Sequence, residues 1–306
     1  MTAIVDAHHH IWRRRDLPWL DGPMQPRIFG AYEPIRRDYP IGEYLTDIAG
    51  CEVARSVYVQ ANWAKASFEE EVAFVQRASD ATGYPHGIVG YADFLADDVR
   101  PQLDRLVKYR AMRGLRMQLH WHANPQYRFA DRPDLARDPT LRRNVAHLSD
   151  YGWTFDLQAF AEQMQGAAEL AASCPGVTFI LQHAGMPEDL SAPGRARWQA
   201  GMRRLAACPN VVSKLSGLGT FIHRNDAEHQ HTAGAAAIAP EHQEARFKLF
   251  NVPVIENLDL QRHTVLPRSE LPAPDSLLTS MNRDAVQLLA HCGALAASPF
   301  YDVWHS

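Results

Sequence analysis

The sequence predicts an α/β fold, a single (β/α)8 TIM barrel over residues 1–306 with an atypical C-terminal segment after about residue 226. Seven apolar or alternating runs of strand length recur before residue 220, and helix-length segments separate them. Strands that alternate with helices form a parallel sheet through right-handed crossovers. Seven such units fit an eight-stranded barrel better than an open sheet, because one further strand would close the barrel.

The expected strands lie near residues 3–8, 56–61, 86–92, 114–120, 153–158, 177–183 and 211–216. The segment FEEEVAFVQRASDATG is typical of the helices between them, since Phe68, Val72 and Val75 fall on one face and Gly83 can end the helix. The connection over residues 13–50 is too long for a simple βα loop. It either builds or covers an active site, or it packs on the barrel as a surface excursion.

The composition argues against several classes of partner. Apolar residues make up 46% of the chain and charged residues 22%, and the net charge is −4. This balance gives no reason to expect nucleic acid or an anionic membrane as partner. We find no bilayer-length apolar run and no secretory start, so we expect a cytoplasmic protein. The four cysteines are far apart and suit reduced thiols. A small-molecule substrate is the expected partner, and a homo-oligomer stays open.

The first strand runs into three consecutive histidines in the stretch IVDAHHHIW. Apolar residues flank these histidines on both sides, so they belong to the fold and not to a purification tag. Because alternate residues of a strand share a face, Asp6, His8 and His10 lie together. Trp12 follows on the same face, and His9 points to the other side. The stretch is therefore a D-x-H-x-H pattern with His9 as a spacer.

Polar side chains also mark the ends of later strands, where parallel barrels carry their functional residues. Asp156 lies in FDLQ, His183 ends the apolar run VTFILQ, and Lys214 alternates within VVSKLSG. In GLRMQLHWH the polar residues alternate with apolar ones and are expected to face the lumen: Arg116, Gln118, His120 and His122.

The convergence of His8, His10 and His183 has two chemical interpretations. Neutral imidazoles are common ligands of first-row metals. Imidazoles also titrate near neutral pH and can carry out acid/base catalysis unaided. A single histidine is more commonly a structural residue, but an H-x-H pair joined by a histidine at the end of the sixth strand is more specific.

Nine motifs together resemble one family. These are DAHHHIW, PWLDGP, YEPIRRDYPIGEYL, SVYVQANW, GIVGYADF, RGLRMQLHW, FDLQ, FILQHAGMP and NVVSKLSGLGTF. They occur in this order over about residues 3–225 and look like the amidohydrolase-related, metal-dependent hydrolases of barrel fold. That group includes sugar lactonases and pyrone dicarboxylate lactonase.

The resemblance implies a hydrolase that opens the lactone ring of a sugar acid or related carboxylic acid. His8 and His10 match the family's first-strand histidine pair, and His183 matches its sixth-strand histidine. The fourth strand offers no bridging lysine for a two-metal site, so the resemblance implies one divalent metal, often zinc, or none. Two alternatives are a metal-dependent decarboxylase and a degenerate barrel that only binds sugar acids.

The last quarter departs from the family pattern. The family's closing strand carries an aspartate as general base, whereas the matching stretch RFKLFNVPVIENL has Asn251. Three explanations stay open: a subgroup with asparagine there, a diverged or frame-shifted C-terminal segment, or another alignment. If the acid is missing, the base comes from Asp6, Asp93, Asp156 or His183, of which Asp156 is favoured at a strand end. The resulting assignments are His183, Asp156 and Arg116 as catalytic residues; His120, Lys214, Trp12 and Arg36 as substrate-binding residues; and His8, His10 and His183 as metal ligands.

Overall fold

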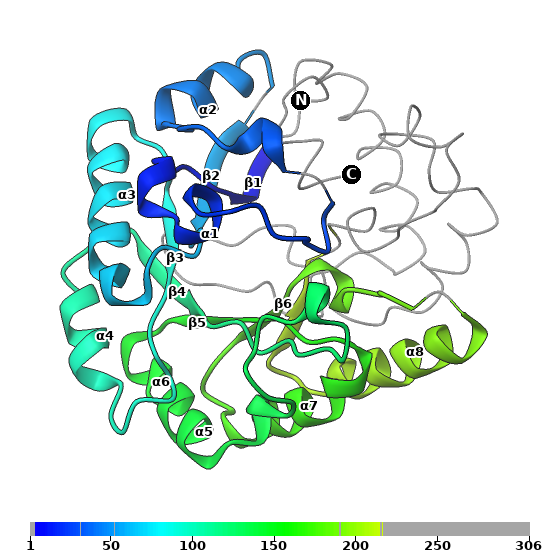
Figure 1. Cartoon of the computed structure of the whole chain (residues 1–306). Helices are drawn as coiled ribbons and strands as arrows, with labels where there is room; N and C mark the ends of the chain where they lie inside the picture. The colour runs from blue at the N-terminus through cyan, green and yellow to red at the C-terminus, as the bar shows by residue number, and fades with distance from the viewer. Residues whose placement is uncertain (1–3, 31, 52, 190, 215, 217–306) are drawn as a thin grey trace, which may run out of the picture.

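The computed structural model describes residues 4–30, 32–51, 53–189, 191–214 and 216 (Figure 1). Within these ranges each of the seven expected strands is present. They form one parallel sheet in which neighbours follow chain order from β1 to β7. The strands are β1 Ile4–His9, β2 Val53–Val59, β3 Gly87–Gly90, β4 Met112–Arg116, β5 Thr154–Leu157, β6 Phe179–Leu181 and β7 Val211–Ser213.

Helices connect the strands, and all the labelled ones except α1 lie around the outside of the curled sheet, whereas α1 lies nearer the centre (Figure 1). The α-helices are α1 Pro18–Asp21, α2 Ile41–Asp47, α3 Phe68–Thr82, α4 Arg100–Leu106, α5 Pro139–Ala146, α6 Leu148–Tyr151, α7 Met164–Ser173 and α8 Ala192–Ala206. Short 3-10 turns are η1 Arg14–Asp16, η2 Glu33–Ile35, η3 Lys65–Ser67, η4 Pro125–Tyr127, η5 Leu135–Arg137, η6 Ala161–Gln163 and η7 His183–Gly185. Sequential parallel strands with external helices are the architecture of an α/β TIM barrel. The predicted closing strand near Asn251 lies outside the described residues.

The helix α3 illustrates how the sequence positions these layers. Phe68, Val72 and Val75 are buried on its inner face, as the helical spacing predicts. Gly83 ends the helix in the left-handed conformation at φ 82°, and its N–H bonds the carbonyl of Ser79 at 2.8 Å. A glycine adopts this conformation without steric cost, so the predicted stop is confirmed.

The strand β4 is shorter than its alternating sequence predicts. Pairing with β5 ends at the Arg116–Asp156 register, so residues 117–120 continue as loop. The alternation nevertheless persists, because Met117 and Leu119 remain buried away from the lumen. A close approach of the two strands requires glycine at 114, where a Cβ would lie 2.2 Å from Thr154 Oγ1.

The first long connection folds back onto the barrel. Trp12 and Tyr39 form an antiparallel bridge, with both backbone N···O distances at 2.9 Å. The Trp12 indole packs 5.1 Å from the Tyr39 ring and donates to the Arg37 carbonyl. This bridge closes residues 13–38 into a long loop that carries η1, α1 and η2, which we call the first excursion. Across the described part of the chain, we find no helix with both the length and the apolar composition to cross a membrane.

Candidate active site

Three histidine rings meet at the carboxyl edge of the sheet. The His8 ring centroid lies 5.0 Å from that of His10 and 5.2 Å from that of His183. His8 and His10 come from the end of β1, and His183 follows β6 directly. The structure therefore brings together the three residues that the sequence singled out as metal ligands.

His9 occupies the opposite side of β1. Its ring stacks on Tyr44 of α2 with centroids 3.9 Å apart and planes at 14°. Tyr44 also donates from its hydroxyl to Asp6 Oδ2 at 2.9 Å, while Asp6 Oδ1 accepts from the His8 N–H. Asp6 and His9 thus anchor the strand end to the outer helix, which agrees with the expectation that His9 is a spacer.

Burial favours the neutral form of His8 and His10. It is the main cause that lowers the pKa of His8 and His10 well below that of a free histidine, and the charges of Lys214 near His8 and Arg116 near His10 act in the same direction. The Nδ1 of His10 lies 2.7 Å from the Val59 carbonyl, so this nitrogen donates and carries the proton. His10 thereby presents Nε2 as its lone-pair nitrogen.

The backbone around His183 is unusual. His183, Ala184 and Met186 all have positive φ angles, at 52°, 51° and 47°. Such conformations are uncommon for residues other than glycine and concentrate at functional sites. The sharp turn directs the His183 ring back over the sheet edge, where its Nδ1 lies 3.0 Å from Ser216 Oγ.

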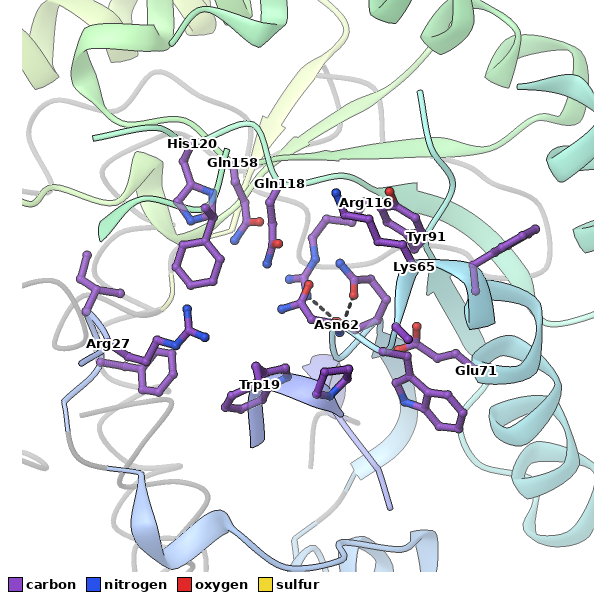
Figure 2. A pocket seen from close by; sticks show the side chains of 18 of the residues that line it. Trp19, Arg27, Asn62, Lys65, Glu71, Tyr91, Arg116, Gln118, His120 and Gln158 are labelled. Carbon is purple, nitrogen blue, oxygen red and sulfur yellow. Dashed lines mark hydrogen bonds between the residues drawn. The ribbon is translucent and has the colours of Figure 1, made fainter. Parts of the chain in front are cut away.

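A cavity of about 370 Å³ opens beside this cluster. Arg116, Gln118 and His120 reach it from the end of β4 and the loop that follows, and Trp19 and Arg27 of the first excursion lie on the facing wall (Figure 2). His183 also lines the cavity. The full lining is Pro18, Trp19, Arg27, Ile28, Phe29, Gln60, Asn62, Trp63, Ala64, Lys65, Phe68, Glu71, Tyr91, Arg116, Gln118, His120, Phe129, Gln158, His183 and Met186. The first long connection therefore does build part of this cavity.

Several polar atoms of the lining are buried without a hydrogen-bond partner among the described residues. They are Arg27 Nε, Trp63 Nε1, Tyr91 Oη, Arg116 Nε, His120 Nδ1 and Gln158 Oε1. Buried polar groups cost free energy unless they are paired, so donors and acceptors that face a cavity suit a polar ligand or ordered water.

Charged groups gather beneath the cavity. Lys214 Nζ lies 3.6 Å from Asp156 Oδ2 and donates to the Ala7 carbonyl at 3.0 Å. Burial raises the pKa of Asp156, and the nearby Lys214 and Arg116 charges oppose that rise. Arg116 itself donates to the Gln60 carbonyl and is almost fully buried. Arg116 enters the cavity, whereas Asp156 and Lys214 are absent from its lining.

A second carboxyl group reaches the cavity from α3. Glu71 Oε1 accepts hydrogen bonds from Tyr58 Oη at 2.7 Å and from the Ala61 N–H at 2.6 Å. Burial is the main cause that raises the pKa of Glu71 to about 7. The sequence reasoning missed this residue, although Glu71 falls three residues after Phe68 and four before Val75, on the apolar face of the helix.

Besides Lys214, two further predicted substrate-binding residues lie outside the cavity lining. Trp12 is buried against Tyr39 and does not line the cavity. Arg36 donates to the carbonyls of Leu20, Asp21 and Gly22 at the end of α1, which fixes the excursion. His120 does line the cavity. The sequence reasoning also missed Arg27, which lies on the facing wall.

The histidine cluster fits a divalent metal in donor type and protonation. Both ring nitrogens of His8 are buried without a hydrogen-bond partner among the described residues, and neutral imidazole is a ligand for first-row metals. The distances between the three histidine side chains, however, do not match those of a closed metal site. Within the described ranges, no three His, Cys, Asp or Glu side chains converge closely enough to hold an ion.

Comparison with known proteins shows the family. The family model described as amidohydrolase matches residues 5–249. An uncharacterised protein of Sinorhizobium fredii is 35% identical over 220 residues, which cover 71% of this chain and 73% of that protein. An L-fucono-1,5-lactonase of Burkholderia multivorans is 32% identical over 226 residues, 71% of this chain and 68% of that protein.

Solved structures agree on the fold. An amidohydrolase from Burkholderia multivorans, solved with bound zinc, covers 99% of both chains with a TM-score of 0.62 at 24% identity. A probable 2-pyrone-4,6-dicarboxylic acid hydrolase from Acinetobacter baumannii covers 96% of this chain and 95% of its own, with a TM-score of 0.55 at 11% identity. By the match over residues 5–249 and the identity to its relatives, this chain belongs to the amidohydrolase family.

Proposed function

We propose that this amidohydrolase opens a lactone ring of a sugar acid or related carboxylic acid by hydrolysis. The observation that carries the proposal is the meeting of His8, His10 and His183 at the strand ends beside a cavity that Arg116 also enters. The L-fucono-1,5-lactonase names of two relatives, at 32% and 27% identity, support the lactone as the scissile group.

In the proposed reaction a water oxygen bonds to the lactone carbonyl carbon. The ring C–O bond then breaks, the ring oxygen takes a proton, and the product is a hydroxy acid that releases a proton near neutral pH. We propose that Arg116, which lines the cavity, stabilises the oxyanion that forms on the carbonyl oxygen. A well-placed donor of this kind contributes about 3–4 kcal/mol to transition-state stabilisation.

Proton transfer is assigned to the groups around the carbonyl. His183 lines the cavity, so we propose that it contacts the carbonyl or the attacking water. Asp156 stays our candidate for the general base. Its carboxylate lies 3.6 Å from Lys214 Nζ, so the two charges compensate each other beneath the site. His120 would hold a substrate oxygen from the cavity wall, whereas Lys214, which is absent from the lining, would act beneath the cavity through its ion pair with Asp156.

His8, His10 and His183 would hold a single divalent metal if one is bound, and zinc is the candidate because a structural neighbour was solved with that ion. Such an ion polarises a carbonyl and lowers the pKa of water from about 15.7 toward about 7.

The test is hydrolysis of a lactone panel, followed as base uptake at constant pH with and without a chelator. We expect ring opening of at least one lactone. Loss of activity with chelator, restored by zinc, supports the metal assignment, whereas full activity with chelator removes that assignment and keeps the hydrolase. Release of carbon dioxide from aromatic acids without lactone turnover would replace our proposal with a decarboxylase. Ligand binding without turnover would identify a degenerate barrel.

A further inference from the structure

The arginines of the first excursion differ in their ionic partners. Five of its six arginines have an acidic partner within 4.0 Å, whereas Arg27 has none among the described residues. The pairs are Arg13–Asp16, Arg14–Asp21, Arg15–Asp16, Arg36–Glu33 and Arg37–Glu43. Arg27 is also the one arginine of this excursion that lines the cavity. Its charge is therefore available to a ligand.

Contacts to the loop after β4 hold Arg27 in place. Its guanidinium carbon lies over the Phe129 ring, 5.4 Å from the centroid, and its carbonyl accepts from Gln126 Nε2 at 2.9 Å. A guanidinium that stacks on an aromatic face keeps its edge for a planar acceptor such as a carboxylate. In Figure 2 the Arg27 side chain points into the space that separates it from Arg116.

The charge balance of the lining favours an anion. Its cations are Arg27, Lys65 and Arg116, and its one acidic residue among the described positions is Glu71. Arg116 already interacts electrostatically with Asp156 and Glu71 beneath the cavity. Lys65 is exposed at the rim, where solvent screens its charge. Arg27 is thus the cavity cation that combines a buried, unbonded Nε with the lack of an acidic partner among the described residues.

We propose that Arg27 binds a carboxylate of the substrate, so that the enzyme selects lactones that carry a negative charge over neutral lactones. The proposal rests on the lactone hydrolysis proposed above and adds the substrate class. The lactone carbonyl lies toward Arg116 and His183, and the carboxylate lies toward the excursion wall. The carboxamides of Gln118 and Gln158 can meet the remaining ring oxygens, because both line the same space.

The experiment compares matched lactones that differ by one carboxylate. Gluconolactone and glucarolactone form a saturated pair, and 2-pyrone and 2-pyrone-6-carboxylate form a flat pair. The measured quantity is the ratio of kcat/KM for the charged over the neutral member. We expect a ratio above about ten for at least one pair in the wild type, and a fall of about tenfold or more in Arg27→Gln, mainly through KM.

Control variants separate the role of Arg27 from general charge effects. Arg15→Gln makes the same charge change on the same excursion at an exposed position outside the lining, and it should leave the ratio unchanged. Arg27→Lys keeps the charge without the planar fork and should give an intermediate ratio. An unchanged ratio in Arg27→Gln, or a larger loss in Lys65→Gln, overturns the proposal.

Failure of the lactone chemistry is distinguishable from failure of this inference. If no lactone is hydrolysed, calorimetry measures binding of the same four compounds to wild type and Arg27→Gln. Tighter binding of a charged member that Arg27→Gln abolishes supports the anion site even though hydrolysis is wrong. Equal binding of the charged members to both proteins, or no binding of either charged member, overturns the anion site.

Discussion

The two walls of the cavity are built in different ways. The strand-end wall carries Arg116 at the end of β4, His120 in the loop that follows β4, and His183 in the turn directly after β6, so each residue lies close to a paired parallel strand. The facing wall, with Trp19 and Arg27, stands on an excursion closed by one short bridge and by side-chain contacts. On our proposal, this difference means that the scaffold positions the reactive groups, while changes in the excursion alter the choice of substrate without disturbing them.

The largest expected effect on stability lies beneath the strand-end wall. Lys214→Met leaves the buried Asp156 carboxylate without its 3.6 Å partner, which we expect to lower the free energy of unfolding by about 3–5 kcal/mol. The double variant Asp156→Asn with Lys214→Met removes the unpaired charge and should recover much of that loss. Urea titrations of the three proteins check this. Equal destabilisation in the single and double variants would show that the pair is not coupled.

The next largest expected effect is a pH dependence of the free energy of unfolding, and it comes from Glu71. Its pKa is raised from 4.5 to about 7, so between these values the folded state binds more protons than the unfolded state. The free energy of unfolding therefore falls as pH rises through this window, by up to about 3 kcal/mol. Glu71→Gln keeps an oxygen that can accept from Tyr58 and Ala61 and has no such titration.

We expect the Glu71→Gln variant to be more stable than wild type at pH 8 and to approach it at pH 5. Chemical denaturation at both pH values measures the difference. If wild type and Glu71→Gln lose the same stability between pH 5 and pH 8, the buried carboxyl does not titrate in this range. His86→Gln, at a partly buried titratable group outside the cavity lining, serves as the control: the pKa of His86 is lowered by burial, so this variant should keep the fall in stability between pH 5 and pH 8 or enlarge it.

The smallest effect is expected on the excursion, away from the cavity. Trp12→Phe removes the indole donor to the Arg37 carbonyl and keeps an aromatic ring against Tyr39. The free energy of unfolding should fall by about 0.5–1.5 kcal/mol, the range for one hydrogen bond. Because Trp12 does not line the cavity, kcat/KM should stay within about twofold of wild type. A large change in kcat/KM at unchanged stability would show that Trp12 takes part in substrate binding, contrary to this expectation.

The fold was predictable because its signals are periodic. Seven strands followed from apolar runs, and the facing of His8 and His10 followed from the alternation of side chains along β1. Distance in sequence did not prevent the placement of His183, because the carboxyl ends of parallel strands share one edge. The expected base position, where Asn251 stands, lies outside the described residues and stays untested.

The excursion was not predictable to the same degree. Six arginines lie within residues 13–37, and nothing in their local sequence separates Arg27 from those held in ion pairs. Arg36 was expected to bind substrate, but three carbonyls at the end of α1 hold it instead. Glu71 differs, since a charged residue on the apolar face of a predicted helix is a sequence signal that could have identified it.

The most direct test of the account is the effect of His183→Ala on lactone ring opening. Our account predicts a loss of kcat/KM of at least about a hundredfold on every lactone that the wild type hydrolyses. It also predicts that the ratio between charged and neutral lactones stays as in wild type, because the excursion wall is unchanged. The thermal unfolding curve reports whether the fold is retained. Undiminished ring opening by a folded His183→Ala variant would contradict the assignment of chemistry to the strand-end wall.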